Sequence, residues 1–417
     1  MKQKKILQDG TIYTFASFGV IISNFFFHAI AGKTLISTDY GTISGLFGLF
    51  GIIAFGCVSL QTKTTELTSR LLAKGKIKEY EILRKSWIRK TTIIGLILTL
   101  GLMPFSKEAN TIFHASSWQW LLFVPTFAVN IPLSAVRGFL QGSQKYKALS
   151  WNFVLESLLK LLLTIIALSL GLGLSGVISA LVISQIPSLI QGLILTKNTP
   201  HNKFDDKKIE ENKFKTPYWI ILIYFGLFAL WFNLDMVLIQ FLRPEIAGSY
   251  SIASKLGQLV LFAGANIGTF IFPILITNLE QNKSNIKIHI TSLVLILLIT
   301  CIGTLTLYFF RGWFINLLFG NQYIEAEKYL PYLCMYGGII ALTHYITHWL
   351  FTIGQKGFIW ILLVGTTVQF ILFYQSLQED IIQSLTIILW SSVINMLLIL
   401  ICLIFSRKKS CTNPSSS

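Results

Sequence analysis

Four ionisable side chains interrupt apolar stretches of this 417-residue chain: Glu156, Lys160, Asp235 and Lys255. An ionised side chain in hydrocarbon costs at least about 2.5–3.5 kcal/mol, so such residues usually face a water-filled cavity or a partner. In a cavity they can bind an ion or a charged solute. These four residues are therefore the first candidates for a functional site.

Asp235 and Lys255 are expected to reach similar depth on two successive membrane spans. Residues 217–242 should rise from the cytoplasm and residues 250–276 descend from outside, and at about 1.5 Å per residue both side chains reach the outer part of the membrane. One interpretation is a structural ion pair. The other is a working site in which Asp235 senses a coupling cation and Lys255 holds a substrate anion. The two are compatible, because a pair that exchanges partners is a switch.

Polar stripes with helical spacing occur on two of the apolar segments. One stripe consists of Lys255, Gln258, Phe262, Asn266 and Thr269, and the other of Tyr13, Ser17, Asn24 and His28. Such stripes sometimes serve only as hydrogen bonds between helices. Their nearly equivalent positions in two halves of the chain favour a shared aqueous cavity, and we predict that Lys255, Gln258, Asn24 and His28 line it.

Glu156 and Lys160 are four residues apart, in the order that favours an ion pair along a helix. Arg137 ends the preceding span at similar depth. We expect the three to form a local clamp within the N-terminal half rather than a functional triad. Arg137, Lys63 and Arg70 are also predicted to lie near the cytoplasmic mouth of the cavity, where basic groups can hold an anion.

No catalytic constellation is present in the sequence. It contains no Walker A motif, HExxH, GxSxG or acidic Mg²⁺-binding cluster. His344 and His348 share a helical face, but their span offers no carboxylate or cysteine to complete a metal site, so hydrogen bonding is expected instead. The five cysteines form no CxxC pair. We expect no cofactor and no enzymatic activity.

The elements that must position these residues are apolar blocks of about 20 residues, the length that crosses a bilayer. We predict twelve spans, at 11–32, 41–62, 91–106, 118–136, 151–170, 174–195, 217–242, 250–276, 286–310, 329–352, 357–375 and 383–405. Alternating them leaves few basic residues in the loops on the outer side: Lys33, Lys107, Arg243, Arg311 and Lys328. Most of the 34 Lys and Arg residues share the side of both termini, so both termini are predicted to be cytoplasmic.

The net charge of +16 comes from the same basic residues in the loops between the spans. Basic residues in short loops fix the orientation and meet anionic lipid head groups, so nucleic acid is not needed as a partner. Hydrophobic residues make up 53% of the chain and the mean hydropathy is +0.66. These values leave no stretch polar enough for a sizeable soluble domain.

A polar stretch divides the chain into two sets of six spans. We predict an N-terminal lobe at 1–196, a cytoplasmic linker at 197–216, a C-terminal lobe at 217–405 and a cytoplasmic tail at 406–417. An even number of spans in each half permits a parallel internal repeat. Residues 64–72 continue a helical pattern, so the second span is expected to extend beyond the membrane.

Several segments resemble the polysaccharide-export flippases of the multidrug/oligosaccharidyl-lipid/polysaccharide (MOP) superfamily. They are Val136-Arg137-Gly138-Phe139-Leu140-Gln141-Gly142 with the following Leu155-Glu156 and Lys160, then Asn233-Leu234-Asp235 leading to Ala247-Gly248-Ser249-Tyr250-Ser251-Ile252-Ala253-Ser254-Lys255, and Phe319-Gly320-Asn321-Gln322-Tyr323. Together with the 6 + 6 arrangement, the resemblance covers nearly the whole chain.

The resemblance implies an all-α polytopic membrane protein with twelve transmembrane helices in two six-helix lobes. Such a protein would move an undecaprenyl-pyrophosphate-linked oligosaccharide across the bacterial inner membrane by alternating access, for surface polysaccharides such as lipopolysaccharide O-antigen. A Na⁺ or H⁺ gradient would drive it. The partners implied are the lipid-linked oligosaccharide, membrane lipids, and a polysaccharide polymerase or ligase.

Two alternatives remain open at this point. Drug/cation antiporters of the MATE type share the fold and the twelve helices, and a membrane-embedded polymerase or ligase of the same pathway would also be apolar. A pyrophosphate needs positive charge in the cavity, which the predicted basic residues supply. Cation export would favour acidic residues, and an enzyme would need acid–base or metal-binding groups at an interface.

Overall fold

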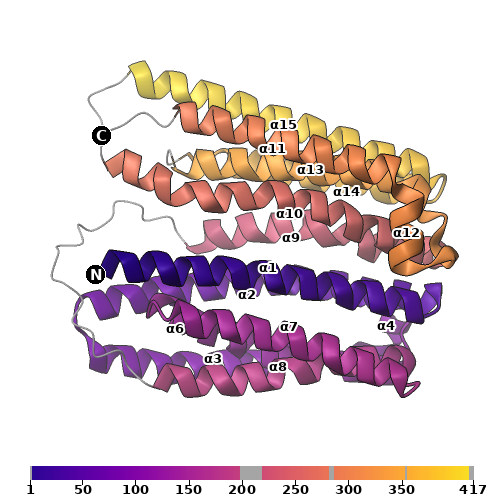
Figure 1. The fold of residues 1–417 in the computed structure, drawn as a ribbon, viewed down its shortest axis with the longest axis horizontal. Helices are drawn as coiled ribbons and strands as arrows, with labels where there is room; N and C mark the ends of the chain where they lie inside the picture. The colour runs from indigo at the N-terminus through magenta and orange to yellow at the C-terminus, as the bar shows by residue number, and fades with distance from the viewer. Residues whose placement is uncertain (1, 198–217, 281–285, 353–354, 413–417) are drawn as a thin grey trace. The chain divides into compact units, whose positions relative to one another are not determined.

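The computed structural model describes residues 2–197, 218–280, 286–352 and 355–412 (Figure 1). Within these ranges the regular secondary structure is helical and contains no strand, which confirms the all-α class. Nine helices of the described part are long and apolar enough to cross a membrane. The chain is therefore a multi-pass membrane protein, while the count of twelve spans and the orientation of the termini stay predictions.

The helices follow the predicted spans closely in most of the chain. The first part contains α1 (Lys2–Thr34), α2 (Ser37–Ala73), α3 (Ile77–Leu102), η1 (Met103–Phe105), α4 (Ser106–Phe113), α5 (Ser117–Phe123), α6 (Pro125–Gly142), α7 (Tyr146–Ser169), α8 (Gly173–Lys197) and α9 (Tyr218–Leu242). The second part contains α10 (Pro244–Glu280), α11 (Ile286–Phe309), α12 (Arg311–Phe319), η2 (Asn321–Tyr323), α13 (Ala326–Thr352), α14 (Phe358–Ser376) and α15 (Ile381–Thr412).

The segment 63–90 is more helical than the sequence suggested. α2 runs to Ala73, as predicted, but α3 already begins at Ile77, well before the expected span at 91–106. Tyr80 packs with Leu72 and Phe139, and Trp87 packs against the same cluster. These apolar residues of α3 recur at helical spacing and form one face. Packing of that face extends α3 beyond the predicted span.

The predicted span 118–136 is divided into α5 and α6. Ser116 caps α5, because its hydroxyl accepts from the amide of Gln119 while the Gln119 side chain accepts from the amide of Ser116. Pro125 occupies the first turn of α6, where a missing N–H removes no helical hydrogen bond. A new helix therefore starts at Pro125.

Close packing joins α2 to α6. A Cβ atom added to Gly138 would lie 2.6 Å from Cβ of Thr64, and one added to Gly142 would lie 2.6 Å from Cβ of Thr68. Ser69 Oγ donates to the carbonyl of Gly142 at 3.1 Å. Small residues four apart let two helix backbones approach in a membrane, and this seam holds α6 at a fixed height along α2.

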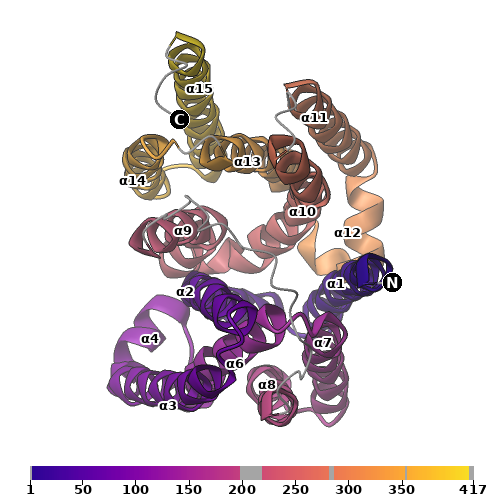
Figure 2. The same cartoon turned by 90° about the vertical axis from the view of Figure 1, so that its left-hand side faces the viewer.

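Two tightly packed groups of helices form the first part of the chain. α2 packs along α6 and α9, and α7 packs along α1 and α8. α8 also packs along α6 and so joins the two groups, whereas α1 touches α2, and α6 touches α7, only sparsely. Figure 2 shows these helices end-on, with α1 beside α7 and α2 beside α6. Space is therefore left between the pair α1–α7 and the pair α2–α6.

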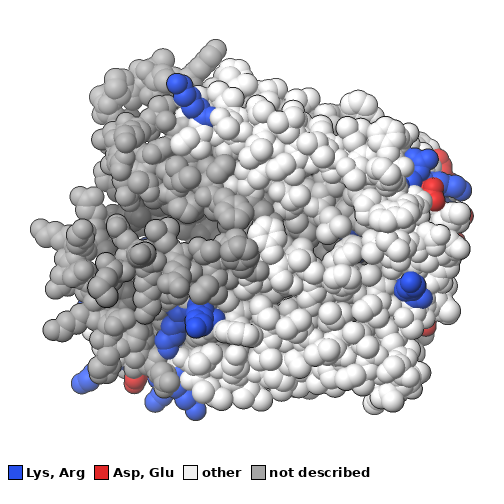
Figure 3. Space-filling view, in the orientation of Figure 1, with Lys and Arg blue, Asp and Glu red and all other residues white. Residues whose placement is uncertain are grey.

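The outward surface of the helices is apolar. Large hydrophobic side chains of α3 and α8 are exposed, among them Ile94, Ile97, Leu100, Ile190 and Ile194. On the face drawn in Figure 3, nearly all charged side chains of the described residues lie near the ends of the helices. This is the pattern of a protein with lipid as its surrounding solvent.

The second part of the chain is also held by close helix contacts. α13 packs against α11 and α15, and α14 packs against α15. A Cβ atom added to Gly257 of α10 would lie 2.6 Å from the carbonyl oxygen of Leu333. The ring of His289 stacks on Trp349 with centroids 3.9 Å apart, and its Nδ1 lies 3.0 Å from the Tyr345 hydroxyl.

By their contacts the helices form two compact units, residues 1–244 and 245–417. α9 packs along α2, so it belongs to the first unit by contact, although the sequence assigns it to the second lobe. Contact alone does not define a repeat. The division into lobes at 1–196 and 217–405 therefore stays a prediction.

Replacing Gly138 by Ala should destabilise the protein, because the new Cβ meets Thr64 and the carbonyl of Gln61. An overpacked interface costs about 1–3 kcal/mol. We expect a lower melting temperature of the detergent-purified protein in Gly138→Ala. Gly101→Ala in α3 is the matched control, since nothing lies within 4 Å of its Cβ; equal effects of the two changes would contradict the seam.

Candidate functional site

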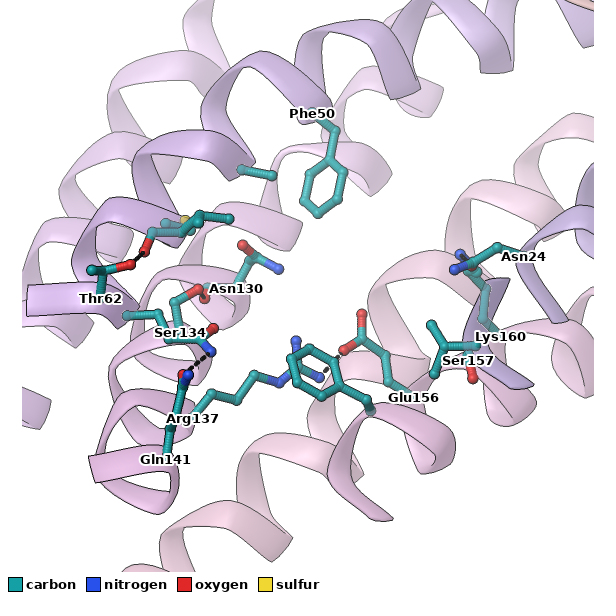
Figure 4. Close-up of a pocket in the computed structure, with 16 residues that line it drawn as sticks. Asn24, Phe50, Thr62, Asn130, Ser134, Arg137, Gln141, Glu156, Ser157 and Lys160 are labelled. Atoms are coloured by element: carbon teal, nitrogen blue, oxygen red, sulfur yellow. Dashed lines mark hydrogen bonds and ion pairs between the residues drawn. The ribbon is translucent and has the colours of Figure 1, made fainter. Parts of the chain in front are cut away.

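A cavity of about 530 Å³ lies within the first unit, between α1, α2, α6 and α7 (Figure 4). Its lining combines two aromatic rings, several side-chain amides and hydroxyls, and three ionisable groups. The principal residues are Phe50, Phe153, Asn24, Gln61, Asn130, Gln141, Ser134, Ser157, Arg137, Glu156 and Lys160. The sparse contact between the two helix pairs explains why it lies there.

Arg137, on α6, is held entirely by neighbouring residues of α7 among its described contacts. Its Nε donates to Oδ1 of Asn152 at 2.8 Å, and its Nη2 forms an ion pair with Oε2 of Glu156. The guanidinium carbon lies 4.1 Å from the centre of the Phe153 ring, a cation–π distance. Only 7% of Arg137 is exposed. The carboxylate of Glu156 compensates this buried charge, and Asn152 and the Phe153 ring stabilise it further.

Asn152 is itself fixed from behind by α8. Its Nδ2 donates to the carbonyl of Ser188 at 2.7 Å and to Oε1 of Gln191 at 3.0 Å. Both the donor and acceptor sides of this buried amide are therefore used. Asn152 orients the Arg137 guanidinium independently of Glu156.

Lys160 lies one helical turn after Glu156 and contacts a different helix. Its Nζ donates to Oδ1 of Asn24 on α1, and it lies 4.8 Å and 5.6 Å from the ring centres of Phe27 and Phe47. No carboxylate of the described residues lies within ion-pairing distance of it. An amide oxygen and two ring faces stabilise this ammonium without neutralising it.

The cavity therefore carries one net positive charge, since Arg137 and Lys160 oppose Glu156. In Figure 4 the Glu156 side chain is drawn between Arg137 and Lys160. A cationic centre surrounded by amides, hydroxyls and aromatic rings can hold an anionic group together with hydroxyl-rich solutes.

Hydrogen bonds between α2 and α6 fix the wall of the cavity. Gln61 Nε2 donates to Oε1 of Gln141 at 2.8 Å, and Thr65 Oγ1 donates to the carbonyl of Gly138 at 3.3 Å. These bonds follow the Gly138–Gly142 seam. The seam thus places Arg137 and Gln141 at the cavity.

The structure brings together two of the predicted site residues, Asn24 and Arg137, in this cavity. His28 does not line it; this buried ring lies instead against Tyr40, with Nδ1 3.2 Å from the hydroxyl. Lys63 and Arg70 do not line it either. Both pair with Glu66, at 3.1 Å and 2.6 Å. Their predicted role at the cytoplasmic mouth remains a prediction.

The predicted clamp is confirmed only in part. Arg137 pairs with Glu156, as expected. Lys160 bonds to Asn24 instead of Glu156, so the expected pair along the helix is wrong for this conformation. All three residues of the clamp line the cavity, whereas only Arg137 was expected there from the sequence.

The remaining predicted residues lie elsewhere. Asp235 is buried on α9, while Lys255, on α10, donates from Nζ to Oε1 of Gln258 at 3.2 Å. Asp235 belongs to the first unit and Lys255 to the second, so their ion pair and their coupling and substrate roles stay predictions. The side chains of Tyr13, Asn266 and Thr269 lie outside the described residues.

Sequence reasoning missed the polar face of α6. Asn130, Ser134, Arg137 and Gln141 follow one another at steps of four, three and four residues, and all line the cavity. That spacing marks a single helix face. The same helical spacing that marked the polar stripes of two other segments was therefore present in this part of the sequence as well.

The described residues contain no group of three or more His, Cys, Asp or Glu side chains that could hold a metal ion. The rings of His344 and His348 lie 4.6 Å apart at their centres. The residues that line the cavity offer charge, hydrogen bonds and aromatic faces for binding.

A family model described as "Polysaccharide biosynthesis protein" matches residues 50–328, more than half of the chain. No curated protein matches the sequence. Among solved structures, the lipid II flippase MurJ in an inward closed conformation is similar, with a TM-score of 0.72 and 14% identity over 94% of this chain and 87% of that chain.

Transporters of the MOP superfamily are similar over almost their whole length. An inward-facing multidrug resistance MATE family transporter gives a TM-score of 0.66 at 13% identity, covering 98% of this chain and 96% of that chain. A MOP superfamily transporter from Pyrococcus furiosus, described as having a binding pocket of reverse polarity, gives 0.58 at 12% identity, covering 97% and 95%. At these identities the likeness establishes the fold.

Removing Arg137 alone should destabilise the protein more than removing Arg137 and Glu156 together. Arg137→Met leaves the Glu156 carboxylate with no cation except Lys160, which is already bonded to Asn24, and we expect a cost of about 2–4 kcal/mol given that Glu156 is 20% exposed. The double change Arg137→Met, Glu156→Leu removes both charges and should recover part of that loss. Melting temperatures in one detergent test this order; additive losses would show that the two charges are not coupled.

Proposed function

This chain belongs to the polysaccharide biosynthesis protein family, and we propose that it is a flippase for an undecaprenyl-pyrophosphate-linked oligosaccharide. It would work in the bacterial inner membrane and supply surface polysaccharide biosynthesis, including O-antigen. The observation that carries the proposal is the cavity in the first unit, where Arg137, Lys160 and Glu156 leave one positive charge among amides and hydroxyls.

The lining of the cavity suits a glycan attached to an anionic group. Asn24, Asn130 and Gln141 offer donors and acceptors to sugar hydroxyls, and Phe50 and Phe153 offer apolar faces. The pyrophosphate would be attracted by the basic residues. The polyprenyl chain would stay in lipid, where it avoids the cost of entering water.

Alternating access would deliver the sugar from one leaflet to the other. In this proposal the cavity opens first to the cytoplasm and then outward, driven by a Na⁺ or H⁺ gradient that Asp235 senses. Lys255 and Gln258, which are hydrogen-bonded to each other, would contribute to the substrate path from the second unit. No chemical step on the substrate is required.

A drug/cation antiporter is the second candidate, since the multidrug transporters have the same fold. The charges in the cavity speak against it, because the carboxylate of Glu156 already pairs with Arg137. A host deleted for its own pumps separates the two functions. Protection from cationic dyes on expression of this chain would favour the antiporter, and unchanged susceptibility would favour the flippase.

Replacing Lys160 by Gln should reduce polysaccharide display at least about tenfold, because the cavity then loses its net positive charge, and a charge-assisted interaction is worth roughly 1.5–3 kcal/mol. The Gln amide keeps an N–H donor for Asn24, so we expect the protein to reach the membrane. Complementation of a flippase-deficient strain, with cell-surface polysaccharide and membrane protein both quantified, measures this. Lys76→Gln is the matched control, because Lys76 forms an exposed pair with Glu79 away from the cavity.

Replacing Lys255 by Ala should abolish display while protein remains in the membrane, because the predicted substrate path then loses its cation in the second unit. The same complementation assay measures this effect. Display at the wild-type level would remove Lys255 from the proposed path and leave the cavity of the first unit as the sole anion site in the proposal.

A further inference from the structure

We propose that Glu156 is an internal counter-ion: it occupies Arg137 while the cavity is empty and moves to Lys160 when an anionic group of the substrate binds Arg137. The inference rests on the proposed function and deepens it. It assigns to one carboxylate a role in the exchange between the empty and the loaded cavity.

The contacts of Arg137 separate a fixed partner from an exchangeable one. Asn152 holds Nε and is itself anchored by α8 through Ser188. Glu156 contacts only Nη2, and its side chain is 20% exposed and lines the cavity. Glu156 can therefore leave without disturbing the position of the guanidinium, and its departure frees an N–H group that faces the cavity.

A second partner for the carboxylate stands one helical turn away. Lys160 follows Glu156 by four residues on α7, the order that favours an ion pair on a helix. Its present contacts are the neutral amide of Asn24 and two ring faces. A change of side-chain rotamer would carry Glu156 from Arg137 to Lys160, so the carboxylate has a cationic partner in both states.

The unloaded step of the proposed transport cycle explains why such an exchange is useful. A guanidinium left without a counter-ion in a low-dielectric interior is strongly destabilising. Glu156 supplies that counter-ion when no substrate is present, so the unloaded protein can pass between its conformations. Because Arg137 is available to an external anion only while Glu156 does not occupy it, the same pairing lowers the apparent affinity for that anion in proportion to the free fraction of Arg137.

Calorimetric titration of the detergent-purified full chain tests the inference, with farnesyl diphosphate as the probe and uncharged farnesol as the ligand control. Glu156→Gln should bind farnesyl diphosphate about tenfold more tightly than the wild type, because the internal competitor is weakened. Polysaccharide display should nevertheless fall, because the empty state loses its counter-ion. Glu79→Gln, in an exposed pair with Lys76, should match the wild type in both assays.

The outcomes distinguish this inference from the proposed function. Binding to the wild type with equal or weaker binding to Glu156→Gln overturns the counter-ion role and leaves the flippase proposal intact. Absence of diphosphate binding to the wild type and both variants overturns both. If Glu156→Gln does not accumulate, Glu156→Asp replaces it: the shorter carboxylate should give a smaller gain in affinity, and an affinity at or below wild type overturns the inference.

Discussion

A positive charge among membrane helices is costly unless a counter-ion, hydrogen bonds or aromatic faces stabilise it, and Arg137, which has all three, shows how this constraint organises the first unit. Its three described partners, Asn152, Phe153 and Glu156, all belong to α7. Asn152 in turn requires α8. One guanidinium thus links a defined face of α7 to α6 and, through Asn152, to α8, in addition to the packing of α8 on both helices.

The first unit presents apolar side chains to lipid and polar side chains to the cavity. Outward faces of α3 and α8 are aliphatic, while the polar face of α6 and the amides of α1 and α2 turn toward the cavity. Glycines at 138 and 142 allow α2 to approach α6 closely enough for Gln61 to bond Gln141. A fold shared with the lipid II flippase and the multidrug transporters therefore presents, in this chain, a cavity with its own charge pattern.

Much of the fold could be predicted from the sequence, because span length and helical periodicity are local properties. The extension of α2 was predicted correctly, whereas the early start of α3 depends on Tyr80 packing against Phe139, a contact between distant segments. At the site, Asn24 and Arg137 were identified from polarity and depth. Depth does not say which way a side chain points: His28 lies against Tyr40 rather than in the cavity of this unit, and Lys160 bonds to Asn24 rather than to the expected Glu156.

The connections between the helix pairs have a mechanical consequence. α1 leads into α2 through residues 35–36, and α6 leads into α7 through residues 143–145, where Gln144 has a φ of 57°. Each of the two sparsely packed boundaries, α1–α2 and α6–α7, is thus connected at one end by a link of two or three residues. So short a link cannot lengthen. α8 packs along both α6 and α7, so the two helix pairs are also joined along that side and do not part there. A bulky solute would have to enter away from α8 and away from these short links.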